Sequence, residues 1–219
     1  MQVKSQKYIA VIDYGMGNLR SVQKALEVVG AETKVTSNPK DLARCEKLVL
    51  PGVGAFGEAM RELKRLKLVE PIKDAIADGK PFLGLCLGLQ LLFERSEEAP
   101  GVKGLCVLEG EVKRFKFRVQ GSGGRVQLKV PHMGWNNISG FRGQGPGFRI
   151  LKGVPENSYM YFVHSYYVKP KGKDVILTTT DYGIDFVSGI CKDNIYGFQF
   201  HPEKSQGLGL KVLENFVNL

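Results

Sequence analysis

An apolar run that ends in a cysteine and passes at once into a helical pattern constrains this chain more than any other feature. The run 82–85 precedes Cys86, and leucines at helical spacing begin at Leu89. The cysteine therefore stands where a strand turns sharply into a helix. Gly84 and Gly88 permit such a corner, because side chains there would strike the neighbouring backbone. The pattern predicts a nucleophile elbow with Cys86 at its tip.

The predicted elbow also favours a reactive sulfur. The first N–H groups of the following helix point at Cys86, and their partial positive charge favours the thiolate, which is the nucleophilic form. The alternative is a buried, inert cysteine, which is a common fate of this residue. The two flanking glycines argue against it, since an ordinary core helix has no use for them.

Length, composition and charge limit the classes of protein and of ligand that suit this chain. With 219 residues, 43% of them hydrophobic, the chain can bury one sizeable core, and we expect a single domain over residues 1–219. The 31 basic and 22 acidic residues give a net charge of +9, which suits an anionic ligand, nucleic acid or an acidic partner surface. Basic and aromatic residues do not interleave as RNA-binding motifs require, so we expect no nucleic-acid partner.

Cysteine and histidine usage argues against a metal. The four cysteines form no C-x-x-C pair, and the only histidines are His132, His164 and His201, so a zinc site lacks ligands. We expect no metal and no other cofactor. Apolar runs fall short of the roughly 18 residues that a membrane helix needs, and no signal peptide or lipidation motif is present. We therefore expect no membrane association and a cytoplasmic protein with reduced thiols.

The first half of the chain alternates strands with helices. Apolar runs predict strands at residues 8–13, 33–36, 47–50 and 82–86. Helical spacing and caps predict helices from 19 to 29, after Asn38-Pro39, from 56 to 68 and from 69 to 77. This alternation indicates an α/β fold, with a doubly wound, mainly parallel central sheet and helices on both faces. Ligands bind such sheets beyond the carboxyl ends of the strands, where Asp13, Pro51–Gly54 and Cys86 converge.

Two of these turns are rich in glycine. Gly15 and Gly17 suggest a dinucleotide site, but the third glycine of that motif would fall at Arg20, so we expect a tight turn that presents backbone instead. Pro51–Gly54 contains two flexible residues, and its backbone amides can be aimed outward or flipped. An ordinary connection between strand and helix is the alternative for this segment.

After about residue 100 the apolar runs become shorter and alternate with polar residues. They predict an additional antiparallel or mixed β region, with strands at residues 105–112, 125–130, 158–168, 175–180, 186–191 and 195–200. A closing helix is predicted from 208 to 216. Gly121–Gly124 and Gly143–Gly147 are expected to be loops.

His201 supplies the best general base. It follows a predicted strand, and Glu203 stands two residues further on with Pro202 between them. In extended backbone, which proline supports, residues two apart face the same way, so the carboxylate can orient the imidazole. Together with the elbow, this pair predicts a Cys-His-Glu triad. An incidental pair at an exposed strand end is the alternative.

From about Tyr8 to Phe216, the chain resembles the class I (triad-type) glutamine amidotransferases. The motifs shared with that class are Pro51–Gly54, Gly84–Gln90 and His201–Glu203. Within the class, the chain resembles the glutaminase subunits of imidazole glycerol phosphate synthase. That finer resemblance depends on Ile12–Val22, Pro131–Asn136, Tyr161–Tyr166 and His201–Ser205.

The resemblance implies roles for individual residues. Cys86 would attack the side-chain amide of L-glutamine, His201 would move the proton, and Glu203 would orient the imidazole. The N–H groups of Val53 and Leu87 would form the oxyanion hole. Substrate-binding positions would be Gly52, Gln90, Tyr161 and Ser165, although the last three could instead be structural. Positions facing a partner would be Asn18, Trp135 and Lys204, although the lysine could instead be merely solvated.

The resemblance also implies a partner. Ammonia released from glutamine would pass to a cyclase subunit, a HisF-type (β/α)₈ barrel bound as a heterodimer, which converts PRFAR to imidazole glycerol phosphate and AICAR. Related subunits that serve anthranilate, aminodeoxychorismate, GMP or carbamoyl phosphate synthesis share the triad, but Pro131–Asn136 and Ile12–Val22 argue against them. Two more distant classes are a cysteine hydrolase on the same sheet and a non-enzymatic interaction module.

Overall fold

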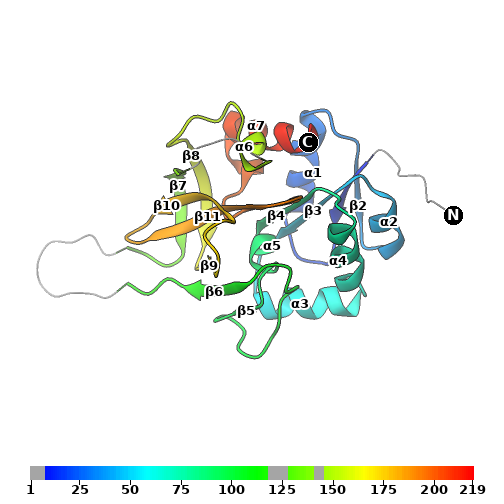
Figure 1. The fold of residues 1–219 in the computed structure, drawn as a ribbon, viewed down its shortest axis with the longest axis horizontal. Helices are drawn as coiled ribbons and strands as arrows, with labels where there is room; N and C mark the ends of the chain where they lie inside the picture. The colour runs from blue at the N-terminus through cyan, green and yellow to red at the C-terminus, as the bar shows by residue number, and fades with distance from the viewer. Residues whose placement is uncertain (1–7, 118–127, 141–145) are drawn as a thin grey trace, which may run out of the picture.

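A large central sheet organises the molecule (Figure 1). The structure, a computed structural model, describes residues 8–117, 128–140 and 146–219. Five parallel strands form one half of the sheet, in the order β2 (Thr33–Thr36), β1 (Ile9–Ile12), β3 (Lys47–Gly52), β4 (Phe82–Cys86) and β12 (Ile195–Phe198). Because β1, β3 and β4 are neighbours and run the same way, the turns that follow them meet at one edge, as predicted.

The sheet continues beyond β12 in a mixed region that the second half of the chain supplies. The remaining strands follow in the order β11 (Asp185–Lys192), β9 (Tyr166–Pro170), β6 (Gly110–Arg114) and β5 (Arg95–Ser96), and β10 (Ile176–Asp181) pairs with β11. All of these pairings are antiparallel except that of β5 with β6. The predicted fold class, mainly parallel in the first half and mixed in the second, is confirmed.

Helices cover both faces of the sheet. One core cluster joins Ala10, Ile12 and Leu50 to side chains of α2 (Pro39–Arg44), α3 (Phe56–Arg65) and α4 (Val69–Ala77). The other joins Ile9 and Val11 to α1 (Leu19–Val28), α6 (Pro146–Ile150) and α7 (Gln206–Val217). Successive strand residues point to opposite faces, so the continuous apolar runs of the sequence supply both cores.

The strand predicted at 158–168 is divided between the central sheet and a separate two-stranded sheet. The run 158–168 is not a single strand, because it divides at Ser165 into β8 (Tyr159–His164) and β9. Strand β8 leaves the main sheet and pairs with β7 (His132–Asn137) in antiparallel register. Strand β7 was not predicted, because its motif at 131–136 is rich in polar residues and glycine.

Two further predictions near the elbow are wrong in extent. The elbow helix α5 spans only Leu87–Gln90, and the strand predicted from residue 105 begins only at Gly110. Both differences have one cause. The backbone N–H of Leu105 donates to Leu91 O, and that of Leu108 donates to Leu92 O. The two segments therefore pair irregularly with each other, which ends the helix and delays the strand.

The predicted helix 56–68 ends earlier than expected, at Arg65, and Lys67 has a positive φ of 55°, which a continuing helix does not allow.

The predicted loop Gly121–Gly124 lies outside the described residues, as do positions 125–127 of the strand predicted at 125–130. Residues 128–130 are not in a strand. Residues 143–145 of the second glycine-rich loop also lie outside, and α6 begins directly after them at Pro146.

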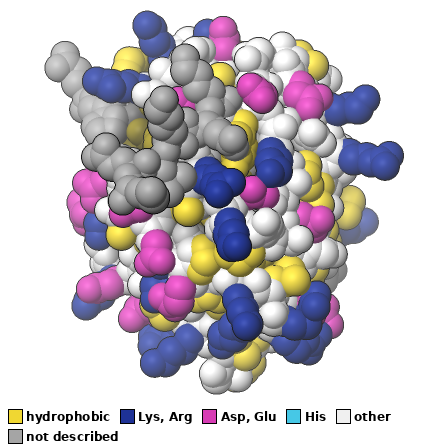
Figure 2. Space-filling view, turned by 90° about the vertical axis from the view of Figure 1, so that its right-hand side faces the viewer, with side chains coloured by type: hydrophobic (Ala, Val, Ile, Leu, Met, Phe, Trp, Pro, Cys, Tyr) yellow, Lys and Arg dark blue, Asp and Glu magenta, His cyan; other side chains and the backbone are white. Residues whose placement is uncertain are grey.

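Charge is dispersed on the surface that Figure 2 shows, where Lys and Arg side chains alternate with Asp and Glu. The net charge of +9 therefore does not gather into one continuous basic patch on that face. Among the described residues, no helix is long and apolar enough to cross a membrane.

Candidate active site

The elbow has the strained backbone that its sequence predicts. Cys86 ends β4 with φ 54° and ψ −108°, a left-handed conformation that costs a residue with a side chain about 1–3 kcal/mol. A Cβ on Gly88 would overlap the backbone oxygen of Leu50, and one on Gly84 would lie 2.8 Å from the oxygen of Gly88. Both glycines are therefore required because strand β3 and helix α5 approach the corner closely.

We expect Gly88→Ala to destabilise the fold by about 3 kcal/mol or more, since the overlap involves backbone that cannot move aside. The free energy of unfolding in urea measures this effect. Gly207→Ala is the matched control, because nothing lies within 4 Å of a Cβ there. Alanine is also the better helix former, so the control should gain up to about 1 kcal/mol. Equal stability of the two variants would contradict the steric argument.

His201 and Glu203 are in direct contact. The imidazole Nδ1 lies 2.8 Å from Glu203 Oε1, and both side chains are almost completely buried. The backbone is not extended as predicted, because Pro202–Lys204 forms the 3₁₀ helix η1. The contact nevertheless forms, since His201 itself is extended and the tight turn brings the carboxylate back to Nδ1.

Cys86 lies close enough to affect the protonation of His201. Burial lowers the pKa of His201, but its interactions with the Cys86 sulfur and with Glu203 outweigh burial and raise that pKa to about 10. The second ring nitrogen, Nε2, has no hydrogen-bond partner within the described part of the chain. It is the nitrogen that Glu203 leaves free, so it is available for proton transfer at the sulfur.

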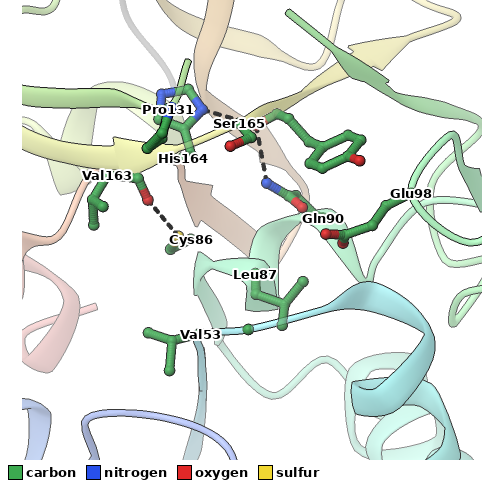
Figure 3. A pocket seen from close by; sticks show the side chains of 11 residues that line it. Val53, Cys86, Leu87, Gln90, Glu98, Pro131, Val163, His164 and Ser165 are labelled. Atoms are coloured by element: carbon green, nitrogen blue, oxygen red, sulfur yellow. Dashed lines mark hydrogen bonds between the residues drawn. The ribbon is translucent and has the colours of Figure 1, made fainter. Parts of the chain in front are cut away.

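A cavity of about 340 Å³ opens beside the thiol (Figure 3). That volume falls in the range of small-molecule sites, about 300–1,000 Å³. Cys86 and Leu87 lie between Val53 on one side and, on the other, Val163 of strand β8 and Ser165, which follows that strand. The complete lining is Val53, Gly54, Cys86, Leu87, Gln90, Glu98, Pro131, Val163, His164, Ser165 and Tyr166.

Five predicted site residues thus line one cavity, but Tyr161 does not belong to that lining. Its ring lies 6.0 Å from the ring of Trp135, and the Lys204 ammonium lies 5.8 Å from its centroid. Tyr161 contributes its backbone instead, because its carbonyl accepts the N–H of His201 at 2.9 Å. The structure therefore places the side chain of Tyr161 beside Trp135 and Lys204, two of the predicted partner positions.

Gly52 and Asn18 lie in the neighbouring turns. A Cβ on Gly52 would overlap the Tyr14 hydroxyl and lie 2.8 Å from Leu87 Cβ, so only glycine fits beside the elbow. Asn18, one of the predicted partner positions, stands at the N-cap position of α1. Its side chain accepts a hydrogen bond from the Ser21 hydroxyl rather than from a backbone N–H.

Sequence reasoning missed two polar residues of the site. Glu98 lines the cavity, and its Oε2 accepts the backbone N–H of Phe56 at 2.8 Å. Gln199 lies beside the thiol, with its Nε2 3.6 Å from Cys86 Sγ. No local pattern marks Glu98, which stands in a charged run like many on the surface. Gln199 stands two residues before His201 among buried apolar residues, and no local pattern marks it as part of the site.

The other two histidines form a buried neutral pair. Burial lowers the pKa of His132 to about 4, and burial is likewise the main reason that the pKa of His164 is lowered to about 3. His164 Nδ1 must donate to the carbonyl of Tyr166 at 2.8 Å, so its Nε2 accepts from His132 Nδ1 at 3.0 Å. The pair packs β7 against β8 and has no proton to exchange near neutral pH. Among the described residues, no cluster of His, Cys, Asp and Glu could hold a metal ion.

Comparison with known structures supports the fold. A crystal structure titled as a glutamine amidotransferase superposes with a TM-score of 0.71, at 19% identity over 96% of this chain and 99% of that one. A structure of PurLQS from Thermotoga maritima gives a TM-score of 0.65, at 18% identity over 97% and 99% of the two chains. At such low identity these likenesses define the architecture alone.

Comparison of sequences defines the family. The family model described as glutamine amidotransferase class-I matches residues 10–219. The chain therefore belongs to the class I glutamine amidotransferases. Its curated relatives include "Imidazole glycerol phosphate synthase subunit HisH" of Aquifex aeolicus, 54% identical over 94% of both chains, and of Geobacter metallireducens, 51% identical over 95% of this chain and 97% of the relative. Within the class, the chain belongs with these HisH subunits.

Proposed function

We propose that this chain is the glutaminase subunit of imidazole glycerol phosphate synthase and that Cys86, His201 and Glu203 hydrolyse L-glutamine. The observation that carries the proposal is that a strained cysteine lines a cavity, that the buried imidazole of His201 interacts with its sulfur, and that a buried carboxylate contacts that imidazole. The family supplies the reaction, glutamine to glutamate and ammonia. The structure supplies groups for each of its steps.

Cys86 attacks the side-chain carbonyl carbon of glutamine, and a C–S bond forms. His201, protonated because its pKa is raised, gives its Nε2 proton to the departing nitrogen, so that ammonia leaves and a thioester remains. The same nitrogen then takes a proton from water, whose oxygen attacks the thioester and releases glutamate. Glu203 holds Nδ1 throughout, which directs Nε2 toward the sulfur.

Negative charge develops on the amide oxygen during both attacks. Leu87 stands at the start of α5, where its N–H is not used within the helix, and Val53 lies on the same side of the cavity. We assign the oxyanion hole to these two N–H groups. Loss of one such donor typically costs about 2.7–4 kcal/mol of barrier height, a factor of about 10²–10³ in rate. Gly52 and Gly54, on either side of Val53, allow its peptide to turn toward or away from the oxyanion.

The far end of the cavity suits the α-carbon groups of an amino acid. Glu98 offers a carboxylate for the ammonium group, and Ser165 offers a hydroxyl. Gln90 uses its amide nitrogen on Tyr166 O and Gln199 Oε1, both at 3.1 Å, so its oxygen is the part left for substrate. Glutamine would thus lie with its ammonium group toward Glu98 and its amide at Cys86.

An apolar surface offers a docking face for the cyclase. Trp135 is 46% exposed, and Tyr159 is 61% exposed on the adjacent strand of the small sheet, with Lys204 close to Tyr161 nearby. We propose that the (β/α)₈ cyclase binds here as a heterodimer and receives the ammonia, with which it converts PRFAR to imidazole glycerol phosphate and AICAR. All four cysteines are free, which suits the cytoplasm as the place of assembly.

Docking should control the rate of glutamine hydrolysis. We expect slow glutamate release by the chain alone and release faster by about 100-fold with the cyclase and its ligand, the effect of one oxyanion donor. Glutamate formation at saturating glutamine measures this. The Trp135→Ala variant should need more cyclase for half-maximal activation yet reach the same plateau. Equal rates with and without the partner would refute the coupling.

A further inference from the structure

Gln199 is the polar side chain that the proposed mechanism leaves without a role. It follows β12, is 0% exposed, and its backbone N–H donates to Ser188 O at 2.9 Å. Its side-chain Nε2 lies 3.6 Å from Cys86 Sγ, within reach of a hydrogen bond to sulfur. Burying a primary amide is costly unless its groups are paired, so this placement calls for a functional or structural reason.

The neighbouring amide fixes which end of Gln199 faces the sulfur. The backbone carbonyl of Tyr166 can only accept, so the group of Gln90 that contacts it must be its nitrogen. The same nitrogen contacts Gln199 at 3.1 Å, and it can donate only to the oxygen there. Gln199 must therefore turn its NH₂ group toward Cys86. Gln90 is itself buried, with 4% of its surface exposed, so the arrangement is rigid.

Two groups then compete for the protonation state of the sulfur. The carbonyl of Val163 lies 3.9 Å from Cys86 Sγ and favours the thiol, which can donate to it. The N–H of Gln199 favours the thiolate, which accepts more strongly than a neutral sulfur. Titratable side chains of other segments, His201 and Tyr14, also interact with Cys86.

We propose that Gln199 is a further catalytic residue, which donates a hydrogen bond to the Cys86 thiolate and which Gln90 locks in the donating orientation. The donor acts twice. It stabilises the attacking thiolate before the C–S bond forms. It stabilises the same sulfur again when water attacks the thioester, because the C–S electron pair returns to sulfur as glutamate leaves. The inference rests on the proposed role of Cys86 as nucleophile.

Alkylation of Cys86 by iodoacetamide tests the hydrogen bond without any reference to glutaminase activity. The full-length chain is treated over a range of pH, and modification of the peptide that carries Cys86 is quantified by mass spectrometry. In Gln199→Met the pH midpoint of alkylation should rise by about one unit, which corresponds to about a tenfold loss of thiolate. In Gln199→Glu it should rise further, because a carboxylate oxygen then faces the sulfur.

Glutamate release with the cyclase bound should fall about tenfold in kcat for Gln199→Met, with KM within about twofold, since the donor touches the sulfur and not the substrate. Gln23→Met on helix α1 is the matched control and should change neither readout. If the midpoint shifted while kcat stayed unchanged, the wild-type hydrogen bond would be supported but its catalytic role would be overturned. Unchanged midpoints in both Gln199 variants would overturn the proposal altogether.

A purely structural role predicts a different pattern. Gln199→Met would then unfold at a lower urea concentration but retain the wild-type midpoint. If the Gln199 variants fail to fold, NMR of the side-chain amides tests the same hydrogen bond in a chain that keeps Gln199. Replacing the sulfur in Cys86→Ala should shift the Gln199 amide resonances and speed their hydrogen exchange, whereas unchanged resonances would overturn the proposal.

Discussion

Glutamate release should fall by about 10⁴-fold or more in Cys86→Ala, because alanine has no atom that can form the thioester. The cavity, His201 and Glu203 remain, so glutamine should still bind. The complex with the cyclase should continue to make imidazole glycerol phosphate when ammonium salts replace glutamine. Assays of glutamate release and of the ammonia-driven reaction, run on the same preparation, measure both expectations.

Cys106→Ala is the matched control for this substitution. Cys106 is an exposed free cysteine that shares a positive φ, 53°, with Cys86 but lies outside the cavity lining. Its replacement should leave both reactions unchanged. If Cys86→Ala released glutamate at the wild-type rate, the proposed nucleophile would be wrong. If it lost the ammonia-driven reaction as well, the effect would lie in docking or folding rather than in chemistry.

Local pattern predicted the first half of the fold well. The central strands β1, β3 and β4 are mostly apolar, because both of their faces are buried, and the turn after each of them carries glycine where the backbone needs it. The edge strand β2 is half polar and only partly buried. The second half was less predictable. Strand β7 is half polar, since one face meets solvent, and the run 158–168 changes sheets at Ser165, where alternation continues without interruption.

The strained corner at Cys86 and the contact of His201 with Glu203 could be predicted because each leaves local marks, namely glycines around Cys86 and a proline between His201 and Glu203. Gln199 and Glu98 could not, since each becomes meaningful only through residues distant in the chain. Gln199 meets Cys86 across 113 positions, and Gln90 meets Tyr166 across 76. The side chain of Tyr161 shows the converse. Its motif matched, and alternation puts it on the same face of β8 as Val163, which lines the cavity, but its ring packs beside Trp135 of the neighbouring strand and lies outside the lining.

Glu203→Gln should reduce glutamate release by about 10³-fold or more, although the two side chains have nearly the same shape. The carboxylate accepts the Nδ1 proton of His201 and compensates its positive charge, and an amide can do only the first. Loss of that charge lowers the pKa of His201, which leaves less imidazolium to protonate the departing ammonia. Glutamate release by the cyclase complex at saturating glutamine measures the loss. Glu109→Gln, which breaks an exposed pair with Lys171, is the control and should have no effect.

The same substitution predicts how stability depends on pH. The pKa of His201 is raised in the folded protein from its ordinary value of 6.5 to about 10, so its ion pair contributes stability fully below pH 6.5 and loses it as the pH rises through 10. The free energy of unfolding of the wild type should therefore exceed that of Glu203→Gln most near pH 6, and the difference should shrink toward pH 10. A difference that stays constant over this range would show that the carboxylate acts through shape and hydrogen bonding alone, and that the imidazolium is not stabilised by its charge.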